Sequence, residues 1–572
     1  MNHLTELFLE RRSYDESFLR DLDNPSHLLL KDVDVLAAKL FTIHEDQNKI
    51  VVLSDFDMDG IMSGVIGYAG LAELGFNVGL YLPDPSLGYG FDEQDIDKLL
   101  SMYPDAKAIL TCDVGITAFA GVEYAKSLGL SVFITDHHQV GEVLPKADVI
   151  INPTREDEDY SLQGICGAYV LYQCLDYYAG RYGTYFDKEQ ISRLRVFAGI
   201  GTVSDSMPML YENRSLVRDA LSICRYLYAD GTDSVVNRLP GTDVYRRAFK
   251  GLYNLLEFFT TLGKISDVRR LDEDFFGFYL APMFNSIKRM DGDMELAFHV
   301  FFGSEPEKAI GELYALNEQR KQAVLDALDE ILSSSAPMSP FVYISSAKSG
   351  LLGLLATRLM EESGVPTLVL KINEDGSYSG SGRSPSWYPF LTQTLNQNLW
   401  AAGHEHAFGC GFNDLSAVMD YQSFIADDMD KALQAYQKLI DDGLIVRDSI
   451  DLVISTMGDG DTLVDIPSFS GFLRDLQLLR PFGPSFEGPK LKVRFRVKHG
   501  DWSLLGADKK HVKIRLAQGF EVLAFNQSDF YLNLDESSSD IVECYGTLSV
   551  NVWNDVRTIQ FLGELKKVGV FS

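Results

Sequence analysis

An apolar run followed by three closely spaced aspartates is the feature that most constrains this chain. Residues 50–53 read Ile-Val-Val-Leu, and the turn after them carries Asp55, Asp57 and Asp59, with Gly60 at its end. A short β-branched run predicts a buried strand, and the glycine predicts the turn that ends it. Three carboxylates at alternate positions repel one another unless a cation lies among them. We therefore expect a metal site at the end of a buried strand, where α/β sheets usually bind their ligands.

Three other interpretations of this stretch are open at this point. Asp-x-Asp-x-Asp-Gly also opens an EF-hand loop, but position 12 of that loop is Ile66, where a bidentate glutamate is needed. A phosphatase that uses Asp55 as a phosphorylated nucleophile would also place its aspartate after an apolar strand. The third interpretation is a solvated acidic turn without chemistry. The rest of the chain has to decide among them.

The composition narrows the class of protein. At 572 residues the chain is too long for one hydrophobic core, so we expect several domains. A formal net charge of −31 disfavours a protein that coats nucleic acid non-specifically, although it allows a locally basic groove for one strand. No run of about 18 apolar residues occurs, so we expect no membrane span. Six scattered cysteines without a Cys-x-x-Cys pair indicate free thiols and a cytoplasmic location.

The order of apolar segments predicts an α/β fold. Short strands at 50–53, 77–82, 108–111, 131–135 and 149–151 alternate with amphipathic helices, which is typical of a parallel sheet covered on both faces. Residues 305–333 predict one long connecting helix, and strands at 341–344 and 367–370 open a second, smaller α/β unit. Alternating residues from 490 onward predict a C-terminal all-β barrel or sandwich with one basic face.

Three further apolar segments end in residues suited to the same metal site. They lead into Asp113, into the run Asp136, His137 and His138, and into Asp205. A single aspartate after a strand is more often a helix cap than a ligand, but two adjacent imidazoles after a buried strand have little structural purpose. Together with the first three aspartates, these residues offer oxygen and imidazole ligands for two divalent cations. That mixture suits Mn²⁺ or Mg²⁺ better than a thiolate-preferring zinc site.

In this order, the four motifs resemble those of the DHH phosphoesterase superfamily. More narrowly, the whole chain resembles RecJ-type single-strand-specific DNA exonucleases, a resemblance carried by further short motifs in family order. These are Gly88-Tyr89-Gly90, Pro282 with Asn285 and Arg289, Ser381-Gly382-Arg383-Ser384, Gly403-His404 with Gly409-Cys410-Gly411, Pro481-Phe482-Gly483-Pro484 and Asn551-Val552-Trp553-Asn554. The chain departs from the family pattern at Met283, Lys288, Lys348 and Ala402.

The resemblance implies a domain order. A DHH catalytic domain with a helical lead-in would occupy residues 1–303, and a connecting helix residues 304–335. A DHHA1 substrate-binding domain would occupy 336–445, a helical linker 446–480, and an OB-like nucleic-acid-binding domain 481–572. The expected fold class is therefore α/β, with a parallel-sheet DHH domain, a smaller α/β domain and a C-terminal OB-like barrel.

The resemblance also implies the roles of the site residues. Two cations would be bound by Asp55, Asp57, Asp59, Asp113, His137 and Asp205. Asp136 would orient or complete this site, and we expect His138 to face the scissile phosphate, with a purely supporting histidine as the alternative. Asn285, Arg289, Arg383 and His404 would bind the substrate strand, with ordinary surface, capping or ion-pair roles as their alternatives.

The implied activity is 5′-to-3′ digestion of single-stranded DNA in recombination and repair. We expect a monomer that binds single-stranded DNA, with a single-strand-binding protein and a helicase as partners and no membrane. One alternative is a DHH phosphodiesterase of short oligonucleotides or cyclic dinucleotides. Another is a catalytically silent binding protein of a replication complex, although every motif carboxylate and both histidines are present.

Overall fold

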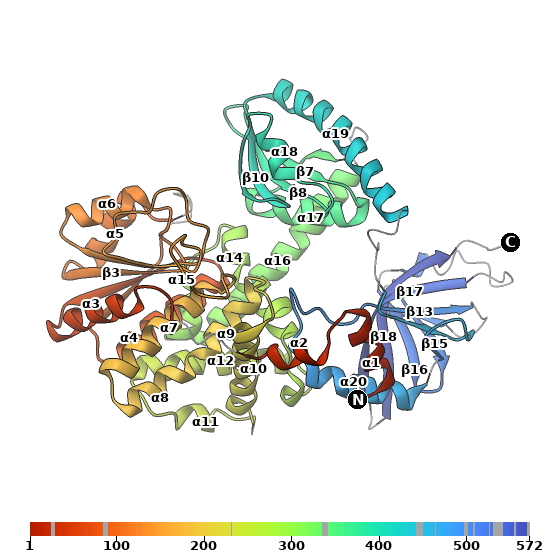
Figure 1. Cartoon of the computed structure of the whole chain (residues 1–572), viewed down its shortest axis with the longest axis horizontal. Helices are drawn as coiled ribbons and strands as arrows, with labels where there is room; N and C mark the ends of the chain where they lie inside the picture. The colour runs from red at the N-terminus through yellow and green to blue at the C-terminus, as the bar shows by residue number, and fades with distance from the viewer. Residues whose placement is uncertain are drawn as a thin grey trace. The chain divides into compact units, whose positions relative to one another are not determined.

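The computed structural model describes residues 1–24, 29–83, 90–229, 231–333, 341–441, 450–463, 465–496, 502–506, 509–525, 527–529, 541–553 and 556–568 (Figure 1). By its internal contacts the chain divides into two compact units. One comprises Met1–Asn24, Pro208–Arg214 and Val446–Ser572, and the other Pro25–Met207 and Ser215–Ile445. Among the described residues, no helix is both long and apolar enough to cross a bilayer.

The larger unit begins with a parallel sheet in the order β2-β1-β3-β4-β5. Its strands are β1 (Lys49–Ser54), β2 (Val78–Tyr81), β3 (Ala106–Cys112), β4 (Ser131–Thr135) and β5 (Val149–Ile151), as the apolar runs predict. Because all five strands are parallel, their carboxyl ends meet at one edge. Every residue that the sequence proposes as a ligand on this sheet follows such an end.

Helices cover both faces of the sheet, as expected for near-continuous apolar strands. Val51 and Leu53 of β1 share one buried cluster with residues of α5 (Glu93–Met102) and α6 (Phe119–Ser127). On the other face, Val52 packs near Gly67 of α4 (Met58–Glu73) and Leu171 of α7 (Gly167–Tyr182). Figure 1 shows this division, with α3 (Val33–Glu45) on the side of α4 and α7.

A helical region follows the sheet and leads into one long helix. Its elements are α8 (Tyr185–Arg193), α9 (Arg195–Ser204), α10 (Tyr211–Leu227), α11 (Ser234–Asn237), α12 (Asp243–Thr261), η2 (Val268–Arg270), the π-helical segment η3 (Phe275–Leu280), α13 (Ala281–Phe284), α14 (Ser286–Arg289) and α15 (Glu295–Phe302). The long helix is α16 (Pro306–Ser333), which confirms the helix expected over 305–333. Its last turns pack on α17 (Leu352–Ser363) through Ile331 and Leu355.

The second sheet of the larger unit is mixed, in the order β6-β7-β8-β10-β9. Its strands are β6 (Val342–Ile344), β7 (Thr367–Ile372), β8 (Tyr378–Arg383), β9 (Trp400–His404) and β10 (Ala407–Phe412), and only β6 and β7 pair in parallel. It is accompanied by η4 (Ser349–Leu351), α17, α18 (Phe390–Leu395) and α19 (Leu415–Asp441). The smaller α/β unit is therefore present.

The smaller unit contains an eight-stranded sheet in the order β12-β11-β13-β17-β18-β16-β15-β14. These are β11 (Leu452–Ser455), β12 (Thr462–Leu463), β13 (Leu491–Arg496), β14 (Trp502–Leu505), β15 (His511–Ala517), β16 (Phe520–Ala524), β17 (Ile541–Trp553) and β18 (Val556–Val568), accompanied by α1 (His3–Arg11), α2 (Glu16–Asp21) and α20 (Ile466–Leu479). The C-terminal all-β domain is thus confirmed.

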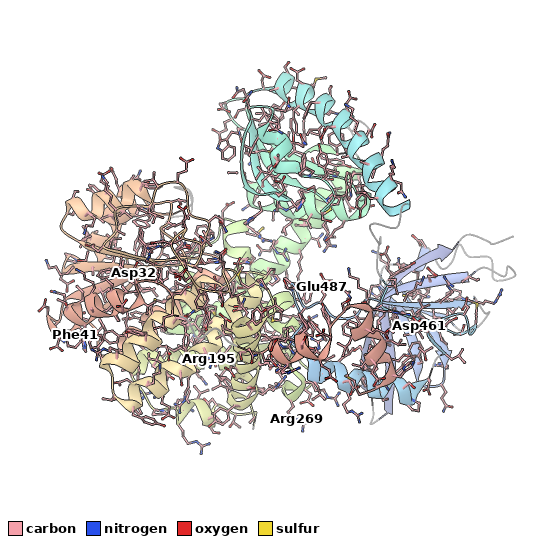
Figure 2. All side chains as sticks on the ribbon, viewed as in Figure 1. Asp32, Phe41, Arg195, Arg269, Asp461 and Glu487 are labelled. Atoms are coloured by element: carbon pink, nitrogen blue, oxygen red, sulfur yellow. The ribbon has the colours of Figure 1, made fainter. Side chains whose placement is uncertain are left out.

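Two segments lie elsewhere than the expected domain order placed them. Residues 446–480 were expected as a helical linker, but β11 and β12 lie within them and pair into the C-terminal sheet. The N-terminal helix α1 was expected with the DHH domain, but it packs on this sheet: Phe8 joins the same buried cluster as Ile454, and Arg11 donates a 2.7 Å hydrogen bond to Asp461, labelled in Figure 2. The position of α1 rests on contacts between residues far apart in sequence, whereas β11 pairs with the nearby β12 and β13.

Candidate metal centre

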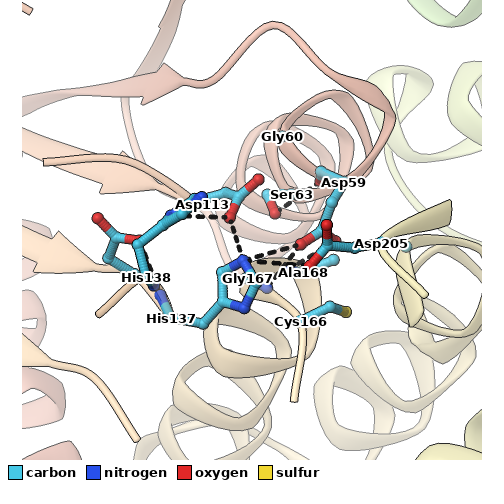
Figure 3. A network of polar contacts seen from close by, with 12 residues as sticks. Asp59, Gly60, Ser63, Asp113, His137, His138, Cys166, Gly167, Ala168 and Asp205 are labelled. Carbon is cyan, nitrogen blue, oxygen red and sulfur yellow. Dashed lines mark hydrogen bonds and ion pairs between the residues drawn. The ribbon is translucent and has the colours of Figure 1, made fainter. Parts of the chain in front are cut away.

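The predicted acidic and imidazole residues converge at the carboxyl edge of the parallel sheet (Figure 3). Three groups of side chains each place ligand atoms within 4.8 Å of one another: Asp55, Asp57 and Asp113; Asp59, His137 and Asp205; and Asp113, His137 and His138. They come from the ends of β1, β3 and β4, from the start of α4 and from the residue after α9. The structure therefore brings together every residue that the four motifs proposed as a ligand.

The turn that carries Asp57 and Asp59 is held by hydrogen bonds from backbone amides at the starts of two helices. Asp57 caps α4, because its Oδ1 accepts hydrogen bonds of 3.0 Å from the amides of Asp59 and Gly60. Asp59 accepts hydrogen bonds from the amides of Gly167 (2.7 Å) and Ala168 (3.2 Å) at the start of α7. Both carboxylates are thereby aimed by helix N-termini, where negative charge is favoured.

Asp113 carries the clearest sign that a cation is needed. Its backbone has a φ of +63°, a left-handed conformation that is uncommon outside glycine. Its Oδ1 lies 3.1 Å from Nε2 of His137, yet this buried oxygen accepts no hydrogen bond in the described part of the chain. A buried carboxylate oxygen without a donor is costly unless a metal ion takes the donor's place.

Asp136 has the opposite surroundings. Its Oδ1 accepts hydrogen bonds from the His137 amide (2.7 Å), the His138 amide (3.1 Å) and Nδ1 of His138 (2.8 Å), and its Oδ2 accepts one from the Ile116 amide (2.9 Å). Burial alone would raise the pKa of Asp136, but the His138 ring and these amides lower it overall. With its oxygens engaged in this way, Asp136 can orient His138 better than it can bind a metal.

Burial and mutual repulsion raise the pKa of four carboxylates of the site. Burial, followed by the charge of Asp57, raises the pKa of Asp55 well above its usual value and that of Asp59 to about 7. Burial and the charges of Asp59, Asp57 and Asp55 do the same for Asp113, and burial with Asp59 raises the pKa of Asp205 to about 7. Divalent cations would relieve this repulsion, and the oxygen and imidazole donors fit hard or borderline ions.

The two histidines differ in protonation. Burial lowers the pKa of His137, which favours the neutral imidazole that a metal ligand requires, and its Nε2 lies 3.5 Å from Asp205 and 3.9 Å from Asp59. Burial also disfavours the charge on His138, but its hydrogen bond to Asp136 and the nearby carboxylates outweigh it and raise the pKa of His138 to about 9. These interactions therefore favour the charged form of His138.

Two residues beside His138 were not predicted from the sequence. The His138 carbonyl accepts hydrogen bonds from Nδ2 of Asn152 (2.9 Å) and Oγ1 of Thr154 (3.0 Å). Both follow β5, the last strand of the parallel sheet. A polar pair directly after an apolar strand was the available signal, the same one that points to Asp113.

The expected substrate-binding residues are placed less uniformly. Oδ1 of Asn285 accepts a 2.8 Å hydrogen bond from the Met58 amide, so Asn285 ties the start of α14 to the aspartate turn. Burial, and after it the positive charges of Arg320 and Arg383, lower the pKa of Arg289. Arg320, on α16, was not predicted. His404 lies exposed on β9, and no hydrogen bond or ion pair in the described ranges joins it to the carboxylates.

The expected basic face of the C-terminal domain is partly neutralised. Lys492 pairs with Glu543 at 3.0 Å, and Arg494 pairs with the same carboxylate. Lys513 pairs with Glu521 at 2.8 Å. Residues 497 and 498, Gly88, Tyr89, Asn554 and the Trp553 side chain lie outside what the structure describes.

Comparison with known proteins agrees with this geometry. Residues 49–198 match the family model described as the DHH family, N-terminal domain, and residues 463–564 match that of the RecJ OB domain. A single-stranded-DNA-specific exonuclease RecJ of Salmonella typhimurium is 30% identical over 417 residues, which cover 66% of this chain and 67% of that protein. This chain belongs to the RecJ family.

Other RecJ proteins extend the likeness along the chain. The single-stranded-DNA-specific exonuclease RecJ of Bacillus subtilis is 26% identical over 587 residues, which cover 98% of this chain and 68% of that protein. The crystal structure of Thermus thermophilus RecJ in complex with Mn²⁺ superposes with a TM-score of 0.70 at 22% identity, covering 100% of this chain and 76% of that one. The resemblance read from the motifs, and the α/β fold with a C-terminal OB domain, are confirmed.

Proposed function

We propose that this chain is a metal-dependent exonuclease that hydrolyses phosphodiester bonds in single-stranded DNA. The observation that carries the proposal is the convergence of buried carboxylates and a neutral imidazole at one sheet edge, including the oxygen of Asp113 that has no hydrogen-bond donor. The RecJ relatives, named as single-stranded-DNA-specific exonucleases, indicate the substrate.

Two cations, Mn²⁺ or Mg²⁺, would be held by the residues with raised pKa and their neighbours. The proposed ligands are Asp55, Asp57, Asp59, Asp113, His137 and Asp205. When bound, such ions act as Lewis acids toward a phosphate oxygen and lower the pKa of a bound water.

The chain's own residues supply the remaining steps. His138 is charged and oriented by the 2.8 Å hydrogen bond from its Nδ1 to Asp136, so it can stabilise charge on the scissile phosphate or donate a proton to the leaving oxygen. Arg289 and Arg383 suit phosphates of the strand, because a guanidinium forms two hydrogen bonds with them. We assign His404 and Asn285 to strand binding on the motif resemblance alone.

We further propose 5′-to-3′ polarity, DNA over RNA, a role in recombination and repair, and a monomer in the cytoplasm. A single-strand-binding protein and a helicase are the proposed partners. The names of the relatives support DNA over RNA, and the motif resemblance supports the other points. The domain order expected from the sequence stays a proposal, with the C-terminal domain extended to include β11 and β12.

The test is a substrate panel. Single strands labelled at the 5′ or the 3′ end, duplexes, RNA and dinucleotides are incubated with Mn²⁺, Mg²⁺ or EDTA. We expect stepwise loss of the 5′ label from single-stranded DNA only, dependent on the metal. Asp113→Ala should lower the rate at least about a hundredfold, whereas Asp329→Ala, an exposed change on α16, should not alter it.

Other outcomes identify the alternatives. Activity confined to dinucleotides would indicate a small-substrate phosphodiesterase, and metal-independent binding without cleavage would indicate a silent binding protein. Undiminished activity in Asp113→Ala would overturn the proposed metal centre.

A further inference from the structure

Lys288 lies beside the carboxylate cluster, and none of the family motifs assigns it a role. It lies on α14, a helix that begins directly after Asn285. The hydrogen bond between Asn285 and the Met58 amide fixes the start of this helix against the aspartate turn. Nζ of Lys288 lies 3.5 Å from the centroid of the Phe56 ring. Because Phe56 lies between Asp55 and Asp57 in the chain, this contact places the ammonium group next to the aspartate turn.

Apart from the Phe56 ring, the ammonium group contacts no partner among the described residues. Surrounding protein lowers the pKa of Lys288, and the only charges acting against this effect are those of Asp55 and Asp57. No hydrogen bond or ion pair to Nζ occurs within the described ranges. Lys348 offers a direct contrast, because its Nζ lies 2.9 Å from Asp291 and donates a 2.8 Å hydrogen bond to the Met290 carbonyl.

Lys288 is also open to solvent. It lines a cavity of about 740 Å³ whose other walls include Leu82, Phe298 and Gly350. Gly350 packs against the backbone of Arg289, the next residue along α14. The cavity wall therefore includes both Lys288 and, in Gly350, a residue that packs on Arg289.

We propose that Lys288 is a substrate-binding residue. It would pair with a phosphate of the single strand at a point between the metal centre and Arg289. The inference rests on the proposed function. An ammonium is a compact charge suited to a phosphate oxygen. Once Asp55 and Asp57 are engaged as ligands, no hydrogen bond or ion pair within the described ranges occupies the ammonium group of Lys288. It can then pair with the strand without giving up an existing ion pair.

The main competing role is structural, with Lys288 acting as a counter-charge that holds Asp55 and Asp57 in place. The two roles differ in what Lys288→Met changes. Loss of a phosphate contact weakens strand binding and its salt dependence, since each contact to a single strand contributes about 0.7 to the slope of log affinity against log salt. Loss of a counter-charge changes metal affinity and leaves the salt slope as it was.

The experiment measures binding of a fluorescent single-stranded oligonucleotide in Mn²⁺, in a His138→Ala background that prevents cleavage. We expect Lys288→Met to weaken binding about tenfold and to reduce the salt slope by roughly 0.7, while calorimetry gives Mn²⁺ binding close to that of the parent. Lys288→Arg should restore most of the affinity. Lys348→Met, which removes a lysine already paired with Asp291, should leave affinity and slope unchanged.

Two results would decide against the inference. If Lys288→Met binds the strand with the parent's affinity and slope while the wild type digests single strands, only the role of Lys288 is wrong. If the wild type neither binds nor cleaves single-stranded DNA, the proposed function fails and this inference with it.

Discussion

Three glycines at the candidate metal centre leave no room for a side chain. A Cβ at Gly60 would lie 2.6 Å from the Cβ of Asp55, and Cβ atoms at Gly167 and Gly201 would collide with the carboxylates of Asp113 and Asp59. None of the three has a positive φ, so their backbones would suit other residues. Glycine is needed here because helices must approach carboxylates closely.

Gly201→Ala tests this requirement in the interior of α9. Alanine normally stabilises a helix by about 0.5–1 kcal/mol relative to glycine, but here its methyl group would displace the Asp59 carboxylate. We expect weaker Mn²⁺ binding in calorimetry and at least about tenfold lower nuclease activity. Gly311→Ala on α16, where nothing lies within 4 Å of the added atom, should gain the usual stability and keep metal affinity. Equal metal affinity in both variants would argue against the steric account.

The sequence predicted the ligands better than their supports. Asp55, Asp113 and His137 follow apolar strands directly, so local pattern alone places them at one edge of a parallel sheet. The amides of Gly167 and Ala168, by contrast, meet Asp59 across 108 and 109 residues. Contacts of that separation depend on tertiary packing, which no local pattern records.

At the scale of elements, α14 is joined to α4 by one side chain. Met58 is buried, and its amide donates a hydrogen bond to Oδ1 of Asn285. The sequence suggested strand binding for Asn285, while the structure shows a link that also fixes the position of Lys288 and Arg289. Both functions can coexist, since the Nδ2 group does not take part in this hydrogen bond.

Asn285→Ala should therefore destabilise the larger unit. It leaves a buried amide without an acceptor, which costs about 1–3 kcal/mol in urea unfolding, and it should lower kcat as the aspartate turn loosens. Asn285→Asp keeps an acceptor oxygen and should recover most of the stability. If Asn285→Ala raises KM alone, with unchanged stability, the side chain serves the substrate and not the turn.

The docking of α1 on the C-terminal sheet predicts a pH dependence. The Arg11 guanidinium, hydrogen-bonded to Asp461, lowers the pKa of that carboxyl despite partial burial. The contribution is therefore present above the usual aspartate pKa and is lost as pH falls through the lowered value. Because Arg11 is partly exposed, we expect the pair to contribute about 1 kcal/mol or less.

The measurement compares wild type with Arg11→Met in urea unfolding between pH 7 and pH 3. We expect Arg11→Met to be less stable at pH 7 and the difference to shrink as the solution becomes acidic. A difference that stays constant down to pH 3 would show that Arg11 acts through packing or its hydrogen bond to the Asp451 carbonyl.

The same docking marks the limit of prediction at this scale. The helix over 305–333 was predictable because its periodicity is local and long, and α16 follows it. The assignment of α1 to the C-terminal sheet was not, since Phe8 and Ile454 are each ordinary apolar residues whose contact spans most of the chain. Strands β11 and β12 were missed for another reason, since they are short and pair with each other and, through β11, with β13.

For the molecule as a whole, the net charge of −31 and the buried acidic cluster both favour binding of cations. The carboxylates there fall into two kinds. Asp113 has a raised pKa and an oxygen without a donor, whereas Asp136 has a lowered pKa and accepts four hydrogen bonds. Asp113 thus weakens the metal-free fold, and Asp136 strengthens it.

Two substitutions of the same chemistry should consequently have opposite effects on stability in EDTA. Asp113→Asn removes a buried charge repelled by its neighbours, so its midpoint of thermal unfolding should rise above that of the wild type, and added Mn²⁺ should no longer raise it further. Asp136→Asn replaces a carboxylate that accepts hydrogen bonds by an amide whose NH₂ group would face those same donors. Its midpoint should therefore fall, and its free energy of unfolding should drop by about 1–3 kcal/mol. Differential scanning calorimetry with and without Mn²⁺ measures both. If both variants are destabilised alike in EDTA, the carboxylates of this edge are held by hydrogen bonds throughout, and the need for cations at Asp113 is refuted.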